Sequence, residues 1–155
     1  MRIFILEDDI DRITLMLEVL SQSPLVQLQT CTSVKDAKLK FTPPCDLILL
    51  DHDLADHHYG RDAAIAEGTG QVFVKWLIEN HTPESLDDPT IIVHSLNYDG
   101  GMRMYKDLRS AGYDAYRIPF GMNVLQLLKQ LTQIAPDTLT SGDDDDKITA
   151  SQNDN

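Results

Sequence analysis

Short apolar runs recur along the chain and alternate with segments in which apolar residues are spaced three and four apart. The runs predict strands buried on both faces of a parallel sheet, because such strands are apolar on consecutive residues. The other segments predict amphipathic helices. We expect strands at residues 2–7, 26–31, 46–51, 90–95 and 114–118. We expect helices at residues 10–22, 33–41, from Thr69 onward, 100–111 and 121–134.

Strand and helix therefore alternate five times. This order predicts an α/β fold of the flavodoxin type, a five-stranded parallel sheet flanked by helices. At 155 residues the chain is long enough for one domain, which we place at residues 1–135. We expect a disordered acidic tail at residues 136–155. The run Asp143–Lys147 in that tail matches an engineered protease-cleavage sequence, so it is either of engineered origin or simply an acidic terminus.

The composition argues against several classes of protein. No apolar run approaches the roughly 20 residues of a membrane span, and the start of the chain turns acidic too early for a signal peptide. We therefore expect a cytoplasmic protein in which Cys31 and Cys45 are reduced core thiols. The net charge is −12, of which −4 lies in residues 143–155. An acidic body argues against nonspecific binding to nucleic acid.

Candidate chemistry gathers where the predicted strands end. Three apolar runs lead directly into Glu7-Asp8-Asp9, Asp51-His52-Asp53 and His94-Ser95. The carboxyl ends of parallel strands share one edge of the sheet, which is the ligand-binding edge of an open α/β fold. Buried acids and imidazoles are costly unless they are paired, so a metal ion or a phosphoryl group is the expected partner.

Asp8 and Asp51 follow strands that are neighbours in such a sheet. Two like charges that close need a cation or a shared proton. We expect Mg²⁺ (or Mn²⁺) there, since Mg²⁺ prefers oxygen ligands and retains waters that a phosphate can displace. The alternative is that both acids only cap nearby helix N-termini.

Two histidines beside these acids are candidates for catalysis. His94 could protonate a leaving oxygen or orient a water, or it could be a core histidine bonded to the backbone. The side chain of His52 should point away from Asp51 and Asp53 unless the strand has already ended. If the strand has ended, the His52 ring could turn into the site and take part in catalysis. Otherwise His52 is a histidine outside the site.

Further polar residues are candidates for binding phosphate oxygens. Ser95 and Asn97 could hydrogen-bond them, although Asn97 also suits the turn before the next helix. Arg117 could clamp a phosphate through its guanidinium. The polar segment at residues 52–68 is longer than an ordinary strand-to-helix loop and carries His57 and His58, which could join the site or be solvated.

Residues 1–134 resemble a response-regulator receiver domain of the CheY-like fold. Glu7 and Asp8 match the acidic pair of that family, and the resemblance implies that Asp8 contacts Mg²⁺ directly. Asp51 matches the aspartate that is phosphorylated, and Asp53 falls where the family uses a backbone carbonyl as a metal ligand. The resemblance therefore implies phosphoryl chemistry at one metal-binding site.

Two positions depart from the receiver pattern. His94 stands at the usual Thr or Ser position with Ser95 next, so a shift of one residue would reverse their roles. Ile118 replaces the usual Lys before Pro119, and the nearest cation in the sequence is Arg117. That Lys pairs with the phosphoryl oxygens in receivers, so its absence argues against ordinary phosphorelay behaviour.

Several motifs together are similar to a divergent receiver subfamily, the cyclic-phosphate processing receiver domain. They are Leu50-Asp51-His52-Asp53-Leu54, Gly68-Thr69-Gly70 opening a helix with Lys75-Trp76-Leu77, and Val93-His94-Ser95-Leu96-Asn97 with Gly100 and Met104. The resemblance implies activity on a cyclic phosphate or another small phosphorylated ligand.

Three functions stay open at this point. A metal-dependent phosphoesterase would open a cyclic phosphate by water, or by attack of Asp51 to form an acyl phosphate. A stand-alone response regulator would instead be phosphorylated on Asp51 by a histidine kinase or a small phosphodonor. A pseudo-receiver would bind a partner without phosphoryl chemistry. The missing Lys weakens the second function, and the retained acids weaken the third.

Overall fold

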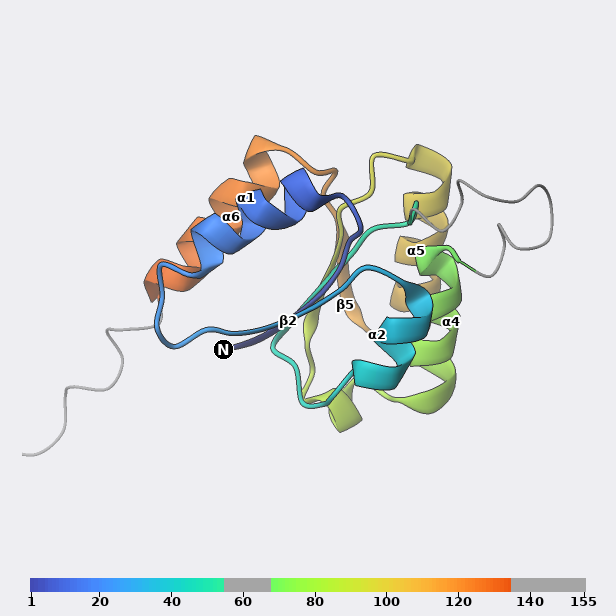
Figure 1. The fold of residues 1–155 in the computed structure, drawn as a ribbon. Coiled ribbons are helices and arrows are strands. Elements are labelled where there is room, and N and C mark those ends of the chain that lie inside the picture. Colours follow the sequence, from blue (N-terminus) through green and yellow to red (C-terminus); the bar gives the residue numbers. More distant parts are fainter. Residues whose placement is uncertain (55–67, 135–155) are drawn as a thin grey trace, which may run out of the picture.

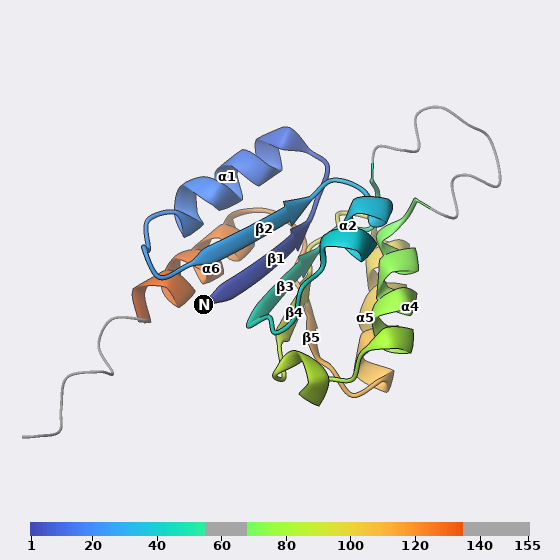
Figure 2. The ribbon, with the colours of Figure 1, turned by 60° about the horizontal axis from the view of Figure 1, so that its bottom comes forward.

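The described part of the protein is one parallel sheet with helices on both faces (Figures 1 and 2). The computed structural model describes residues 1–54 and 68–134. The strands lie in the order β2-β1-β3-β4-β5, so β2 and β5 form the edges. Their bounds are β1 Arg2–Leu6, β2 Gln27–Cys31, β3 Leu47–Leu50, β4 Thr90–Val93 and β5 Asp114–Arg117. Every neighbouring pair is parallel, which confirms the predicted α/β fold class.

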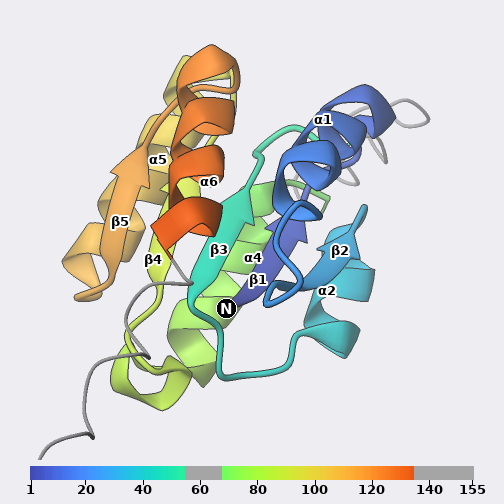
Figure 3. The same ribbon diagram turned by 90° about the vertical axis from the view of Figure 1, so that its left-hand side faces the viewer.

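The helices divide into two layers. Their bounds are α1 Ile10–Leu20, α2 Val34–Lys40, α4 Gly70–Asn80, α5 Tyr98–Ser110 and α6 Met122–Ile134. Helices α1 and α6 lie side by side on one face of the sheet, and α2, α4 and α5 cover the other (Figures 1 and 3). A short 3-10 turn, η2 Glu84–Leu86, lies in the connection between α4 and β4. Both faces of the sheet are therefore covered, as the continuous apolar runs require.

Alternation along each strand builds two separate apolar cores. In β1, Ile3 and Ile5 pack with Met16 of α1 on one face. Phe4 and Leu6 pack on the other face, with side chains such as Phe73 of α4. The face on which a residue lies thus follows from its position along the strand, and this rule extends to the polar residues just beyond the strand ends.

Most strands end earlier than the sequence pattern predicts. β1 stops at Leu6, β3 at Leu50, β4 at Val93 and β5 at Arg117, each one or two residues before the expected end. The polar residues that follow therefore lie on the rim of the sheet. Helix α5 begins at Tyr98, two residues before its predicted start, because the Asn97 side chain caps it by accepting a bond from the Gly100 amide.

Both cysteines lie within the described residues. Cys31 and Cys45 are buried free cysteines, as expected. Trp76 packs against the core from a partly buried position.

None of the helices that the structure describes is long and apolar enough to cross a membrane. The predicted tail, with its run Asp143–Lys147, lies outside the described residues.

Candidate functional site

The first residue after each of four strands lies in one row across the sheet. The row consists of Glu7, Asp51, His94 and Ile118, and their amides continue the parallel ladder at 2.9 to 3.1 Å. Because side chains alternate between faces, all four lie on the face covered by α1 and α6. Ile118 packs against the apolar cluster of that face. From β1 to β5, the row changes from acidic to apolar.

The acidic end of the row forms a carboxylate cluster. Glu7, Asp8 and Asp51 each offer one carboxylate oxygen, and these atoms lie within 4.8 Å of one another. Glu7 is 0% exposed and Asp51 is 2% exposed, while Asp8 is partly buried. The predicted convergence of Asp8 and Asp51 at the sheet rim is therefore present in the structure.

Burial makes both carboxylates of the row costly to ionise. Desolvation is the main cause that raises the pKa of Glu7 from 4.5 to about 7, and the charge of Asp51 adds to it. The backbone amides of Asp8 and Asp9 both donate to Glu7 Oε1 at 3.0 Å and act in the opposite direction. Desolvation also raises the pKa of Asp51, against a hydrogen bond from the Ser95 side chain. Such a cluster favours a cation.

A cation that the sequence reasoning missed lies among these acids. Arg12 Nη1 is 3.5 Å from Glu7 Oε2 and 3.7 Å from Asp51 Oδ2. Arg12 Nε is 3.6 Å from Asp9 Oδ2, and Asp9 is the residue that caps α1. One signal was available, since a cation in the first turn of a helix opposes the helix dipole and calls for nearby acids.

His94 lies beneath the cluster. The side chain is 0% exposed, and its Nδ1 is 3.6 Å from Glu7 Oε2. Neither ring nitrogen has a hydrogen-bond partner among the described residues. Desolvation, together with the charge of Arg12, lowers the pKa of His94 to about 3, so the imidazole is neutral. His94 thus belongs to the row of residues that follow the strands, but it does not line the cavity described next.

A polar cavity of about 250 Å³ opens beside the carboxylates. It is lined by Asp8, Asp9, Arg12, Asp51, Asp53, Ser95, Leu96 and Asn97. The structure therefore brings together most of the predicted metal-binding residues with two of the predicted phosphate-binding residues, Ser95 and Asn97. Ser95, rather than His94, presents its side chain to this cavity.

His52 and Asp53 form a second polar group at the edge of the cavity. His52 Nδ1 lies 2.6 Å from Asp53 Oδ1, which also accepts a bond of 3.1 Å from Asn97 Nδ2. The His52 ring packs against Gly100 of α5, where a Cβ atom would lie only 2.5 Å from the ring. As expected, His52 points to the face opposite Asp51. Its contact with Asp53 differs from the expectation, because the strand has already ended.

Arg117, a predicted phosphate clamp, lies away from the cavity. Its guanidinium carbon is 4.8 Å from the centroid of the Tyr98 ring. Its Nε is buried without a hydrogen-bond partner among the described residues, beneath Gly101 of α5. The structure does not bring Arg117 to the carboxylates. His57 and His58 lie outside the described residues.

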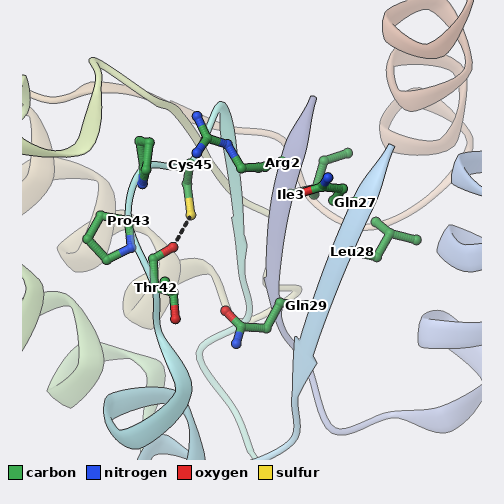
Figure 4. Close-up of a pocket in the computed structure, with 9 residues that line it drawn as sticks. Arg2, Ile3, Gln27, Leu28, Gln29, Thr42, Pro43 and Cys45 are labelled. Carbon is green, nitrogen blue, oxygen red and sulfur yellow. Dashed lines mark hydrogen bonds between the residues drawn. The ribbon is translucent and has the colours of Figure 1, made fainter. Parts of the chain in front are cut away.

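Another cavity of about 250 Å³ lies at the opposite rim, between the starts of β1 and β2 and the segment that leads into β3 (Figure 4). It is lined by Arg2, Ile3, Gln27, Leu28, Gln29, Thr42, Pro43, Pro44 and Cys45. The Cys45 thiol donates to the Thr42 carbonyl across 3.6 Å. None of these lining residues is a carboxylate, so the acidic cavity is the better candidate for phosphoryl or metal chemistry.

The donor set of the acidic cavity fits a hard divalent cation. Glu7, Asp8 and Asp51 offer only oxygen, the ligand type that Mg²⁺ and Mn²⁺ prefer. Asp51 Oδ1 is buried and has no hydrogen-bond partner among the described residues. A buried carboxylate oxygen in that position is costly unless an ion or a proton satisfies it.

Comparisons with known proteins give a family for the sequence and similar structures for the fold. Residues 3–110 match the sequence model of the family described as the cyclic-phosphate processing receiver domain. The fold is similar to a phosphorylated cyanobacterial phytochrome response regulator, RcpA, at 20% identity and TM-score 0.59, covering 90% of this chain and 98% of that one. It is similar to the HemR receiver domain of Leptospira biflexa at 18% identity and TM-score 0.58, covering 92% and 98%.

A third similar structure is the Mn²⁺-bound form of the response regulator Rcp1, at 16% identity and TM-score 0.56, covering 92% of this chain and 99% of that one. No curated protein matches the chain. Together, these likenesses agree with the sheet order and the layers seen here.

Proposed function

Because the chain belongs to the cyclic-phosphate processing receiver domain family, we propose that it is a metal-dependent phosphoesterase that opens cyclic phosphates. The observation that carries the proposal is the meeting of three carboxylates beside one polar cavity, which a guanidinium and a hydroxyl also line. Carboxylates supply a cation site, and the other two groups suit phosphate oxygens. A small cyclic-phosphate ligand fits this combination of charges.

Glu7, Asp8 and Asp51 would hold Mg²⁺ or Mn²⁺, with Asp53 at the edge of the same cavity. When bound, the ion supplies Lewis-acid polarisation of a phosphate oxygen. The donor set supports this assignment, since all of its groups are hard oxygen ligands.

In this proposal, different residues of the chain bind the phosphate and promote attack on phosphorus. Ser95 and Asn97 hydrogen-bond phosphate oxygens from the β4 side of the cavity. Asp51 either orients an attacking water or attacks phosphorus itself. In the net reaction water adds to phosphorus, one ester P–O bond breaks, and the leaving oxygen takes up a proton. The product is a phosphomonoester with a free hydroxyl.

The two histidines act from outside the cavity in this proposal. His94, 3.6 Å from Glu7 Oε2, positions that carboxylate from below. His52 holds Asp53 through their 2.6 Å contact and so helps to shape the β3 side of the site. Because Glu7 is one of the proposed metal ligands, we expect His94→Ala to weaken Mn²⁺ binding and turnover together. Loss of turnover with unchanged Mn²⁺ affinity would mean that His94 acts on the substrate instead.

The second candidate function is a response regulator phosphorylated on Asp51 by a histidine kinase. Asp51 favours it, because this carboxylate lies at the end of the central strand β3 and lines the cavity. Ile118 weighs against it, because the position before Pro119, where receivers carry Lys, packs into the apolar cluster.

One experiment separates these functions. The protein is incubated with 2′,3′-cyclic nucleotides and Mg²⁺ or Mn²⁺, beside Asp51→Asn and the control Asp36→Asn, a part-exposed carboxylate on α2 paired with Lys40. We expect turnover by the wild type and the control, and none by Asp51→Asn. Phosphoryl uptake from acetyl phosphate without turnover would favour the response regulator. If neither occurs and Mn²⁺ does not bind, both phosphoryl functions are wrong.

A further inference from the structure

We propose that Arg12 is a resident counter-ion of the acid cluster, which a divalent ion displaces and which then binds the phosphate of the substrate. The first half of this proposal concerns metal binding alone. The second half rests on the proposed function, because it assumes a phosphate in the acidic cavity.

The contacts of Arg12 are those of a loosely held cation. Its guanidinium nitrogens lie 3.5 to 3.7 Å from carboxylate oxygens of Glu7, Asp9 and Asp51. Strong charge-assisted bonds between nitrogen and oxygen are shorter, about 2.7–2.9 Å. Arg12 therefore neutralises several acids at once without being locked to any of them.

The guanidinium also has room and support for movement. The Arg12 side chain is 23% exposed and lines the polar cavity. The guanidinium carbon lies 5.5 Å from the centroid of the Phe120 ring, within the range of a cation–π contact. Such a platform holds the charge by its ring face while the fork of nitrogen donors changes partners.

Competition with a metal ion follows from these positions. Glu7 and Asp51 belong both to the carboxylate cluster and to the ion pairs of Arg12. A divalent cation on those oxygens would repel the guanidinium and take over its partners. Arg12 always carries its charge, so it cannot relieve the repulsion by losing a proton and must move instead.

The acidic cavity offers a destination for the displaced charge. Among the residues that line it, Arg12 is the cation, while Ser95 and Asn97 provide uncharged polar groups. A phosphate held there would meet a guanidinium, which binds phosphate through two parallel bonds. Arg12 of α1 thus supplies the charge that Ile118, packed against the apolar cluster, does not supply from β5.

Mn²⁺ titration of Arg12→Met tests the first half. Calorimetry or electron paramagnetic resonance is performed without substrate, beside Arg103→Met, which removes one exposed charge from α5. We expect Arg12→Met to bind Mn²⁺ about tenfold more tightly, which corresponds to about 1.4 kcal/mol. Arg103→Met should change the affinity much less. Equal or weaker Mn²⁺ binding by Arg12→Met, with an unchanged thermal melt, would overturn the proposal.

Inorganic phosphate tests the second half on the Mn²⁺-loaded proteins. We expect Arg12→Met to bind phosphate at least about tenfold more weakly than the wild type, and Arg12→Lys to lie between them. Unchanged phosphate affinity would overturn this half alone. If Arg12→Met does not fold, Arg12→Lys carries both titrations, and an affinity for Mn²⁺ and phosphate identical to that of the wild type contradicts the proposal. Failure of the proposed function appears separately, as wild-type protein that binds Mn²⁺ and phosphate but turns over no cyclic phosphate.

Discussion

The two halves of the sheet rim carry different chemistry on the same backbone frame. On the β1–β3 side, Glu7 and Asp51 form a buried acidic pair that Arg12 bridges. On the β4–β5 side, His94 is buried and neutral and Ile118 packs against the apolar cluster. All four residues belong to one row, and each continues the ladder with its amide.

The difference shows that the ladder fixes where these four residues lie, whereas the residue type at each position decides its charge. In the receiver pattern, the cation of such a site comes from the strand that corresponds to β5. Here the cation within reach of the acids comes from α1, which packs over the β1–β3 half. Because the acids and their cation lie in one half of the rim, the other half can be apolar. Substitutions in each half therefore test this division separately.

The largest loss of stability is expected at Gly70, where α4 packs against the backbone of Asp51 in the acidic half. A Cβ atom on Gly70, the first residue of α4, would lie 1.9 Å from the Asp51 carbonyl oxygen and 3.1 Å from Met104 Cε. Both the carbonyl and the helix start would have to move. We therefore expect Gly70→Ala to lower the free energy of unfolding by about 3 kcal/mol in a urea titration.

Gly101→Ala is the matched control for that change. Gly101 is also a buried glycine near the start of a helix, but the nearest atom to its added Cβ is Arg117 Nε at 3.0 Å, near the end of a flexible side chain. Alanine also favours the helix by up to about 1 kcal/mol relative to glycine. We expect a change within about 1 kcal/mol. Equal loss in both variants would show that the Asp51 carbonyl is not the cause.

Most of the fold could be predicted because each strand is apolar on consecutive residues. The runs ending at Leu6, Leu50 and Val93 predicted strands, and their alternation with helices predicted a parallel sheet. The exact strand ends could not be read, because Glu7, Asp51 and His94 still hydrogen-bond along the ladder although the strands have ended. The helix predicted at residues 33–41 corresponds to α2, where the Ser33 hydroxyl caps the first turn by accepting a bond from the Asp36 amide.

The candidate site divides in the same way. The meeting of Asp8 and Asp51 could be predicted, since it needs only neighbouring strands and a shared edge. The place of Arg12 could not, because it depends on how α1 packs over that edge. The burial of His94 and the contact of Arg117 with the Tyr98 ring also depend on packing between elements. The pattern of apolar and polar residues along the sequence does not predict such packing.

The pH dependence of stability should separate the two halves, because their buried groups titrate in opposite senses. Glu7, with its pKa raised from 4.5 to about 7, keeps a proton in the folded state that the unfolded chain has released. Protonated Glu7 therefore lowers the free energy of unfolding as pH rises from 4.5 to about 7. His94, with its pKa lowered from 6.5 to about 3, lacks a proton that the unfolded chain binds. It therefore adds stability as pH rises through its own window.

Glu7→Gln isolates the contribution of Glu7. Relative to the wild type, the variant should gain about 2 kcal/mol of unfolding free energy as pH rises through the window of Glu7, in metal-free buffer. Urea titrations at several pH values measure this difference, and titrations common to both proteins cancel. Glu18→Gln, which removes an exposed carboxyl from α1, is the control for loss of one charge. A difference that stays constant with pH would contradict the assignment of a buried, protonated Glu7.

The smallest effect is expected at the cation of the β4–β5 half. Arg117 contacts the exposed ring of Tyr98 and does not line the acidic cavity. A cation–π contact at an exposed site contributes about 0.5–1 kcal/mol, so Arg117→Gln should lower the free energy of unfolding by no more than that. Its affinity for inorganic phosphate with Mn²⁺ should stay near that of the wild type. A loss as large as that expected for Arg12→Met would mean that the guanidinium leaves Tyr98 to reach the phosphate, and that both halves of the rim supply a cation to one site.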